Sequence, residues 1–79
     1  LLVNVRVSSK PEVMGDADVL AATRKVEEAL GDDGRILLRE SGTEPLIRVM
    51  VEAKTDDLCK KYVDEVVKVI REKGYEDKA

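Results

Sequence analysis

The central segment of this 79-residue chain, residues 35–53, reads RILLRESGTEPLIRVMVEA. Apolar and polar residues alternate on either side of its Ser-Gly-Thr-Glu-Pro run, which is the pattern of two half-buried strands joined by a loop. We therefore predict strands over 35–39 and 46–53, connected as a hairpin. Their core-facing residues are Ile36, Leu38, Ile47, Val49, Val51 and Ala53. Arg39 and Arg48 then share the opposite, open face of the sheet.

The segments on both sides of the hairpin predict one more strand and two helices. Residues 1–7 alternate in the same way, and residues 8–15 break the pattern with Ser, Pro and Gly, which predicts an irregular connection. One helix, capped by Asp16 or Asp18, ends at Gly31, and another begins after the N-cap Thr55 and runs to about Lys73. Their buried stripes are Val19, Ala22, Val26, Ala29 and Leu30 in the first helix and Cys59, Tyr62, Val63, Val66, Val67 and Ile70 in the second.

The predicted order of these elements is β-α-β-β-α, which places the chain in the α+β class. Two helices would cover one face of a small, mostly antiparallel sheet, because each element then buries its apolar side. The pattern leaves the order of the strands in the sheet open. The length suffices for one core, so we expect a single domain over 1–74. Gly74 ends the last helix, and residues 75–79 predict a disordered polar tail.

Composition excludes several classes of function. The chain has no His and one Cys, so we expect no zinc or other metal site, no internal disulfide and no catalytic Ser-His or Cys-His pair in it. A net charge of −3 and the absence of Phe and Trp argue against a nucleic-acid partner. No apolar run approaches the roughly 20 residues that span a bilayer, so we expect no membrane partner and a cytoplasmic location. The chain opens on strand-like residues at Leu1, which suggests a fragment of a longer protein.

The hairpin loop carries the residues with the most chemistry. Arg39 and Arg48 lie on one face, and Ser41, Gly42 and Thr43 lie between them in the sequence. Arginines form charge-assisted bonds to phosphate oxygens, while small residues let hydroxyls and backbone amides close around the rest of the anion. The pattern therefore indicates a phosphate-binding loop.

An ordinary turn is the alternative interpretation, and on spacing alone it is the more frequent outcome. Ser-Gly-Thr followed by Glu-Pro is common turn chemistry, and an arginine on an open sheet face is usually solvated or paired with a carboxylate such as Glu52. Three neighbouring residues, Asn4, Arg6 and Glu40, have no assigned role at this stage. Cys59 lies on an apolar helix stripe, which predicts a buried thiol and not a nucleophile.

The run from Arg39 to Glu52, together with residues 2–7, resembles the phosphate-binding loop and first strand of the C-terminal domain of the α-D-phosphohexomutases. Within that superfamily the two runs are most similar to the branch of bacterial phosphoglucosamine mutases. The similarity covers nearly the whole chain, and it implies a fold like that of the TATA-binding protein. Glu40 stands where relatives often have Pro or Lys, and we expect its side chain to point away from the phosphate.

The resemblance implies a parent isomerase of four domains, of which this is the last. Such an enzyme interconverts glucosamine 6-phosphate and glucosamine 1-phosphate through a phosphoserine and a 1,6-bisphosphate, with Mg²⁺ bound by another domain. By matching positions, Arg39, Ser41, Gly42 and Thr43 would contact the substrate phosphate, with Arg48 as a further contact. The isolated chain would bind a hexosamine phosphate and the other domains but would not be catalytic. The alternatives are the same domain of a phosphomannomutase or phosphoglucomutase, and a non-catalytic anion-binding regulatory module.

Overall fold

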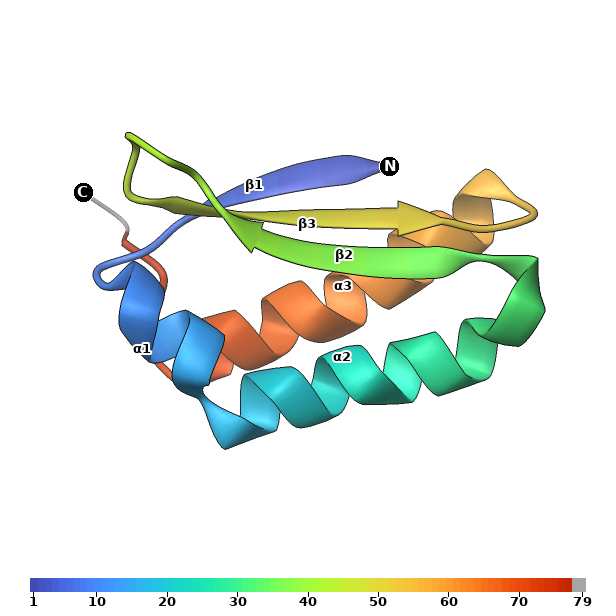
Figure 1. The fold of residues 1–79 in the computed structure, drawn as a ribbon, viewed down its shortest axis with the longest axis horizontal. Coiled ribbons are helices and arrows are strands. Elements are labelled where there is room, and N and C mark those ends of the chain that lie inside the picture. The colour runs from blue at the N-terminus through green and yellow to red at the C-terminus, as the bar shows by residue number, and fades with distance from the viewer. Residues whose placement is uncertain (78–79) are drawn as a thin grey trace.

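The structure, a computed structural model, describes residues 1–77 and arranges them in two layers. One layer is a three-stranded sheet, and the other contains two long helices that lie side by side against it (Figure 1). The elements are β1 (Leu2–Arg6), α1 (Lys10–Gly15), α2 (Ala17–Leu30), the short 3₁₀ helix η1 (Gly31–Asp33), β2 (Arg35–Glu40), β3 (Leu46–Glu52) and α3 (Asp56–Glu72). This architecture confirms the predicted α+β class with two long helices on one face of the sheet.

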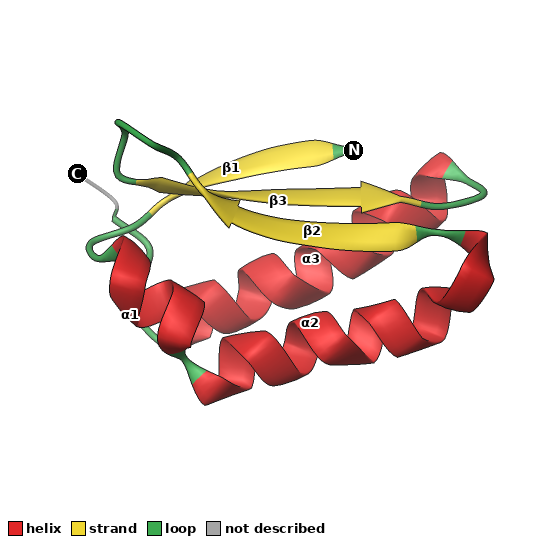
Figure 2. Ribbon diagram, viewed as in Figure 1, coloured by secondary structure: helices red, strands yellow, loops and turns green. Residues whose placement is uncertain are grey.

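The sheet has β3 at its centre and is entirely antiparallel (Figure 2). Its strand order is β1-β3-β2, which the sequence left open. The side chains of β3 alternate as predicted, because Ile47, Val49 and Val51 are fully buried while Arg48 is exposed. A shift of one residue would turn that apolar set toward solvent, so the alternation also fixes the register of the hairpin.

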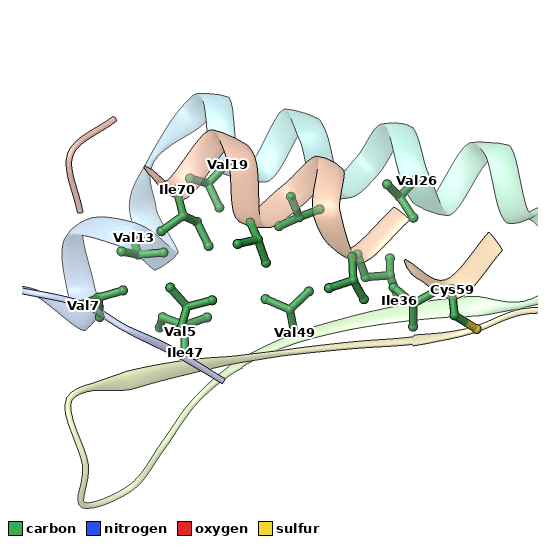
Figure 3. Packing of buried hydrophobic residues seen from close by; sticks show 14 of the residues in the cluster. Val5, Val7, Val13, Val19, Val26, Ile36, Ile47, Val49, Cys59 and Ile70 are labelled. Carbon is green, nitrogen blue, oxygen red and sulfur yellow. The ribbon is translucent and has the colours of Figure 1, made fainter. Parts of the chain in front are cut away.

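The core fills the space between the sheet and the two long helices (Figure 3). The predicted stripe of α3 is buried except for Tyr62, which is half-buried. The stripe of α2 differs at two positions, because Ala29 is exposed and Thr23 is buried. Residues 19, 23, 26 and 30 follow one face of the helix, and Ala29 lies beside that face. The Thr23 hydroxyl donates a 2.9 Å hydrogen bond to the Val19 carbonyl oxygen, which satisfies this buried polar group within its own helix.

Residues 10–15 form a short helix, α1, so the predicted irregular connection is wrong there. Ser9 caps this helix, since its hydroxyl oxygen accepts a 3.4 Å hydrogen bond from the amide of Glu12. Pro11 lies in the first turn, where its missing N–H removes no helical bond. Val13 is completely buried and anchors the helix to the core (Figure 3). The observed order is thus β-α-α-β-β-α, because a six-residue helix is too short to show helical periodicity in its sequence.

Residues 75–77 pack against the beginning of the chain, so the expected disordered tail is wrong over these residues. The amide of Ser8 donates a 2.9 Å hydrogen bond to the Tyr75 carbonyl oxygen. The Tyr75 hydroxyl donates to the Asp16 carboxylate at 2.6 Å, which lowers the pKa of Asp16 and raises that of Tyr75. The rest of the predicted tail, residues 78–79, lies outside the described residues.

Candidate anion-binding site

Two arginines face each other across neighbouring strands on the open side of the sheet. Arg39 on β2 and Arg48 on β3 are direct register partners, and Asn4 on β1 pairs with Arg48 from the other side. Both arginines are exposed, and neither makes an ion pair or a hydrogen bond from its side chain to any residue in 1–77. Like charges directly opposite one another destabilise a sheet by roughly 0.2 to 1 kcal/mol. The fold therefore places two unneutralised cations together, and an anion between them would relieve their repulsion.

The carboxylate that could have neutralised these arginines is already engaged. Glu52 accepts two hydrogen bonds from Arg35, at 3.0 Å from Nε and 3.1 Å from Nη2. These bonds, and then the charge of the partner, lower the pKa of Glu52 and raise that of Arg35. The alternative in which Glu52 pairs with Arg39 or Arg48 is therefore wrong. Arg35 forms this ion pair with Glu52 at the end of β2 that lies farthest from the loop.

Ser41 holds the loop between β2 and β3 in shape. Its amide donates a 3.0 Å hydrogen bond to the Leu46 carbonyl oxygen, which closes the hairpin. Its hydroxyl oxygen accepts a 3.3 Å bond from the amide of Glu44. The residue is only 6% exposed, although the hydroxyl proton still has no acceptor within residues 1–77. Ser41 therefore stabilises the loop through its amide and its hydroxyl oxygen, and its hydroxyl proton remains available for a ligand.

Gly42 and Thr43 form the exposed tip of the same loop. Neither backbone amide donates a hydrogen bond to a residue in the described part of the chain, and the Thr43 hydroxyl is also without a partner there. A Cβ added to Gly42 would meet no atom within 4 Å, and the backbone there does not have a positive φ. The fold itself therefore does not require glycine at this position. A glycine that the fold does not need fits a loop whose backbone must be approached closely by a ligand.

Lys10 also contacts this loop, and the sequence analysis missed it. Its ammonium group donates a 2.7 Å hydrogen bond to the Ser41 carbonyl oxygen. Figure 1 shows why the two meet, since α1 and the β2–β3 loop lie at the same end of the molecule. The only signal in the sequence was a lysine in a segment without recognised secondary structure. The contact adds a cation to the loop that joins the strands of the two arginines.

The three residues without an assigned role fall on different sides of the sheet. Asn4 lies in the row of Arg48 and Arg39, so it shares their face. Arg6 is opposite Leu46 on β3 and is exposed at the loop end of β1. Glu40 is opposite the buried Ile47, so its side chain alternates to the other face of β2 from Arg39. The carboxylate of Glu40 therefore does not compete directly with an anion on the open face.

An apolar hollow adjoins the two arginines. It has a volume of about 400 Å³ and is bordered by Leu2, Arg35, Leu37, Arg39, Arg48 and Met50. The strand register explains the apolar side of this hollow. Leu2, Met50 and Leu37 form one cross-strand row, and it lies next to the row that contains Arg48 and Arg39. A hollow of about 460 Å³ lies between α2 and α3 on the other layer, away from this loop. The arrangement on the open face can take a ligand with one anionic end and a less polar remainder.

Two kinds of feature are not found in residues 1–77. No group of three or more His, Cys, Asp or Glu side chains is arranged to hold a metal ion there. No helix in that part of the chain has both the length and the apolar character needed to cross a membrane.

Comparisons with known proteins identify the family of the chain. Residues 2–69 match the family described as phosphoglucomutase/phosphomannomutase, C-terminal domain. The chain is 59% identical over 75 residues to a phosphoglucosamine mutase of Lachnospira eligens and 55% identical over 75 residues to one of Lachnoclostridium phytofermentans, with 95% of the chain covered in each case. It is also 55% identical to the phosphoglucosamine mutase of Bacillus subtilis over 71 residues, or 90% of the chain. The chain spans 16% to 17% of the length of these curated relatives.

Proposed function

The chain belongs to the phosphoglucomutase/phosphomannomutase family, as its C-terminal domain, and on that premise we propose that it binds the non-reacting phosphate of the sugar in a phosphoglucosamine mutase. The observation that carries this proposal is the unpaired arginine pair, Arg39 opposite Arg48, beside a loop tip with free amides. The names of the relatives, which are 51% to 59% identical, support glucosamine phosphate as the substrate class.

Each proposed contact follows from the chemistry of its group. Arg39 and Arg48 supply charge-assisted hydrogen bonds, which contribute about 1.5 to 3 kcal/mol each. The Gly42 and Thr43 amides and the hydroxyls of Ser41 and Thr43 supply neutral donors for the remaining oxygens. Several such bonds hold the phosphate firmly although the chain carries a net charge of −3.

The proposed contribution to the reaction is positioning. A phosphate held here fixes the orientation of the sugar, so that binding energy from a remote group accelerates the step at the other end. No group of three or more His, Cys, Asp or Glu side chains is arranged to hold a metal ion within residues 1–77. We propose that the Mg²⁺ expected of the parent enzyme is held by another of its domains, and that the other domains complete the active site.

A titration of the 79-residue chain followed by ¹⁵N–¹H NMR tests the proposal. We expect inorganic phosphate and glucosamine 6-phosphate to shift the amides of residues 39–43 and 48 at millimolar concentration. Unphosphorylated glucosamine and a short RNA should shift none of them. If phosphate leaves these amides unchanged and the same is true in the full-length enzyme, the proposed function is wrong.

The choice among sugars needs the whole enzyme. A full-length enzyme that turns over glucosamine phosphates and not mannose or glucose phosphates would support the proposed substrate. The reverse preference would assign the domain to a phosphomannomutase or phosphoglucomutase, and phosphate binding without any mutase activity would favour a regulatory module.

The cytoplasmic location expected from the sequence stays a prediction, which fractionation of cells that produce the parent protein would test.

A further inference from the structure

Lys10 reaches from the first turn of α1 to the candidate loop. Its ammonium group lies 2.7 Å from the carbonyl oxygen of Ser41, a residue 31 positions away in the sequence. The lysine is half-buried, and it forms no ion pair with a carboxylate in residues 1–77. Holding a long side chain in one conformation reduces its entropy, so a fixed and unpaired lysine requires an explanation.

The beginning of α1 is a rigid place for this lysine. Ser9 caps the helix immediately before it, and Val13 is fully buried one turn later. The segment before the cap is also fixed, because the amide of Val7 donates a 2.9 Å hydrogen bond to the carbonyl oxygen of Pro45 at the other end of the loop. Lys10 therefore extends from an anchored backbone toward an anchored loop.

The bond falls on the peptide group that joins Ser41 to Gly42. Its oxygen belongs to Ser41, and its N–H is the Gly42 amide, which has no acceptor in the described part of the chain. A cation at the oxygen draws electron density through the peptide, so the N–H becomes a stronger donor. It also prevents the peptide from rotating, because Ser41 is otherwise held only through its amide and its hydroxyl.

We propose that Lys10 is a positioning residue of the phosphate loop. It holds the Ser41–Gly42 peptide in one orientation and strengthens the Gly42 amide as a donor to the bound phosphate. This inference rests on the proposed function, since it concerns the same loop and the same ligand. A purely structural bond between α1 and the loop would contribute to folding but would leave the phosphate affinity of the folded chain unchanged.

The test compares variants of the 79-residue chain with inorganic phosphate as the probe. We expect Lys10→Met to weaken phosphate binding about tenfold, because the Ser41–Gly42 peptide is no longer held and the Gly42 amide becomes a weaker donor. Lys10→Arg restores a cationic donor and should recover most of the affinity. Lys25→Met removes the same charge from an exposed position of α2 on the other layer, and it should change the affinity by less than about twofold.

Two further readouts separate positioning from folding. The Gly42 amide proton of Lys10→Met should resonate upfield of its wild-type position before phosphate is added, and its phosphate-induced shift should be smaller. Urea unfolding of each variant gives the folded fraction, by which the measured affinity is corrected. Should Lys10→Met not fold, Lys10→Gln keeps a donor without the charge, and weaker phosphate binding by that folded variant is then the expected result.

The remaining outcomes distinguish the proposed role of Lys10 from the proposed function of the domain. Unchanged affinity in Lys10→Met, with binding lost in Arg39→Ala, would overturn the role of Lys10 and leave the proposed function intact. An affinity loss that disappears after correction for the folded fraction would also overturn it. If neither Lys10→Met nor Arg39→Ala changes phosphate binding, the proposed function itself is wrong.

Discussion

Arg39 and Arg48 are direct cross-strand partners on the open face of the sheet, and no carboxylate in residues 1–77 neutralises either of them. The nearby Glu52 is bound by Arg35 through two hydrogen bonds. Of these three arginines, Arg35 is neutralised, while Arg39 and Arg48 have no side-chain partner in residues 1–77.

Removing one member of the free pair should affect stability and binding in opposite directions. Arg39→Ala relieves a repulsion between like charges, so we expect the free energy of unfolding to stay constant or to rise by up to about 1 kcal/mol. Phosphate affinity should fall by about tenfold or more, since one charge-assisted contact contributes about 1.5 to 3 kcal/mol. Urea unfolding and phosphate titration measure the two effects.

Arg35→Ala is the matched control, on the same strand and the same face. It breaks the pair with Glu52, so we expect it to lower the urea midpoint and to affect phosphate binding much less than Arg39→Ala does. Equal losses of affinity in both variants would mean that only the general charge of this face attracts the anion.

Two glycines should respond differently to the same substitution. A Cβ at Gly34 would lie 2.2 Å from the Glu52 carbonyl oxygen, so Gly34→Ala must displace the end of β3 and should destabilise the chain by about 1 to 3 kcal/mol. Gly42→Ala meets no atom within 4 Å, so the unfolding free energy should stay within about 0.5 kcal/mol of wild type. Thermal unfolding compares the two variants directly.

The phosphate affinity of Gly42→Ala is a second test, separate from its unfolding free energy. The methyl group of Gly42→Ala would stand at the tip of the loop, where the ligand must approach the backbone, and we expect weaker phosphate binding. Gly15→Ala is the control, since a Cβ there also meets nothing within 4 Å but lies at the end of α1. Wild-type affinity in Gly42→Ala would show that the ligand does not contact the loop tip.

Stability should fall in acid partly through Asp16. Its carboxylate accepts hydrogen bonds from the Tyr75 hydroxyl and from the amides of Val19 and Asp18, and these bonds lower its pKa. A group with a lower pKa in the folded state stabilises the fold above its unfolded pKa, near pH 4, and this contribution disappears as the pH falls through the folded pKa. Urea unfolding from pH 2 to pH 7 should therefore show an acid limb that is shallower in Asp16→Asn. Asparagine keeps the helix cap without a titrating carboxyl.

The same contact predicts that the tail contributes to the fold. Tyr75→Phe removes the hydroxyl that donates to Asp16 at 2.6 Å, so the melting temperature should decrease. Tyr62→Phe is a matched control, because the Tyr62 hydroxyl has no hydrogen bond to any residue in 1–77 and its ring would remain in place. Equal melting temperatures for Tyr75→Phe and the wild type would argue against a structural role for this hydroxyl.

The long elements could be predicted because their periodicity is visible in the sequence. The alternation over 46–52 determines which residues of β3 face the core, and it therefore determined that Arg39 and Arg48 share the open face. The stripe of α3 was equally clear, since five of its residues are fully or nearly fully buried. The loop residues were proposed as a site because arginine, serine, glycine and threonine in this order are typical of phosphate recognition and of the family.

Short elements and distant contacts depended on the tertiary structure. Six residues are too few to show helical periodicity, and the stability of α1 comes from burial of Val13 in a core built by other segments. The position of β3 between its neighbours, the packing of Tyr75 on Asp16 and the bond from Lys10 to Ser41 all join residues far apart in the chain. Periodicity reports only which face of an element is buried. Which segments meet across the core is decided by how the whole set of apolar faces packs together, and that arrangement brought a third cation to the loop.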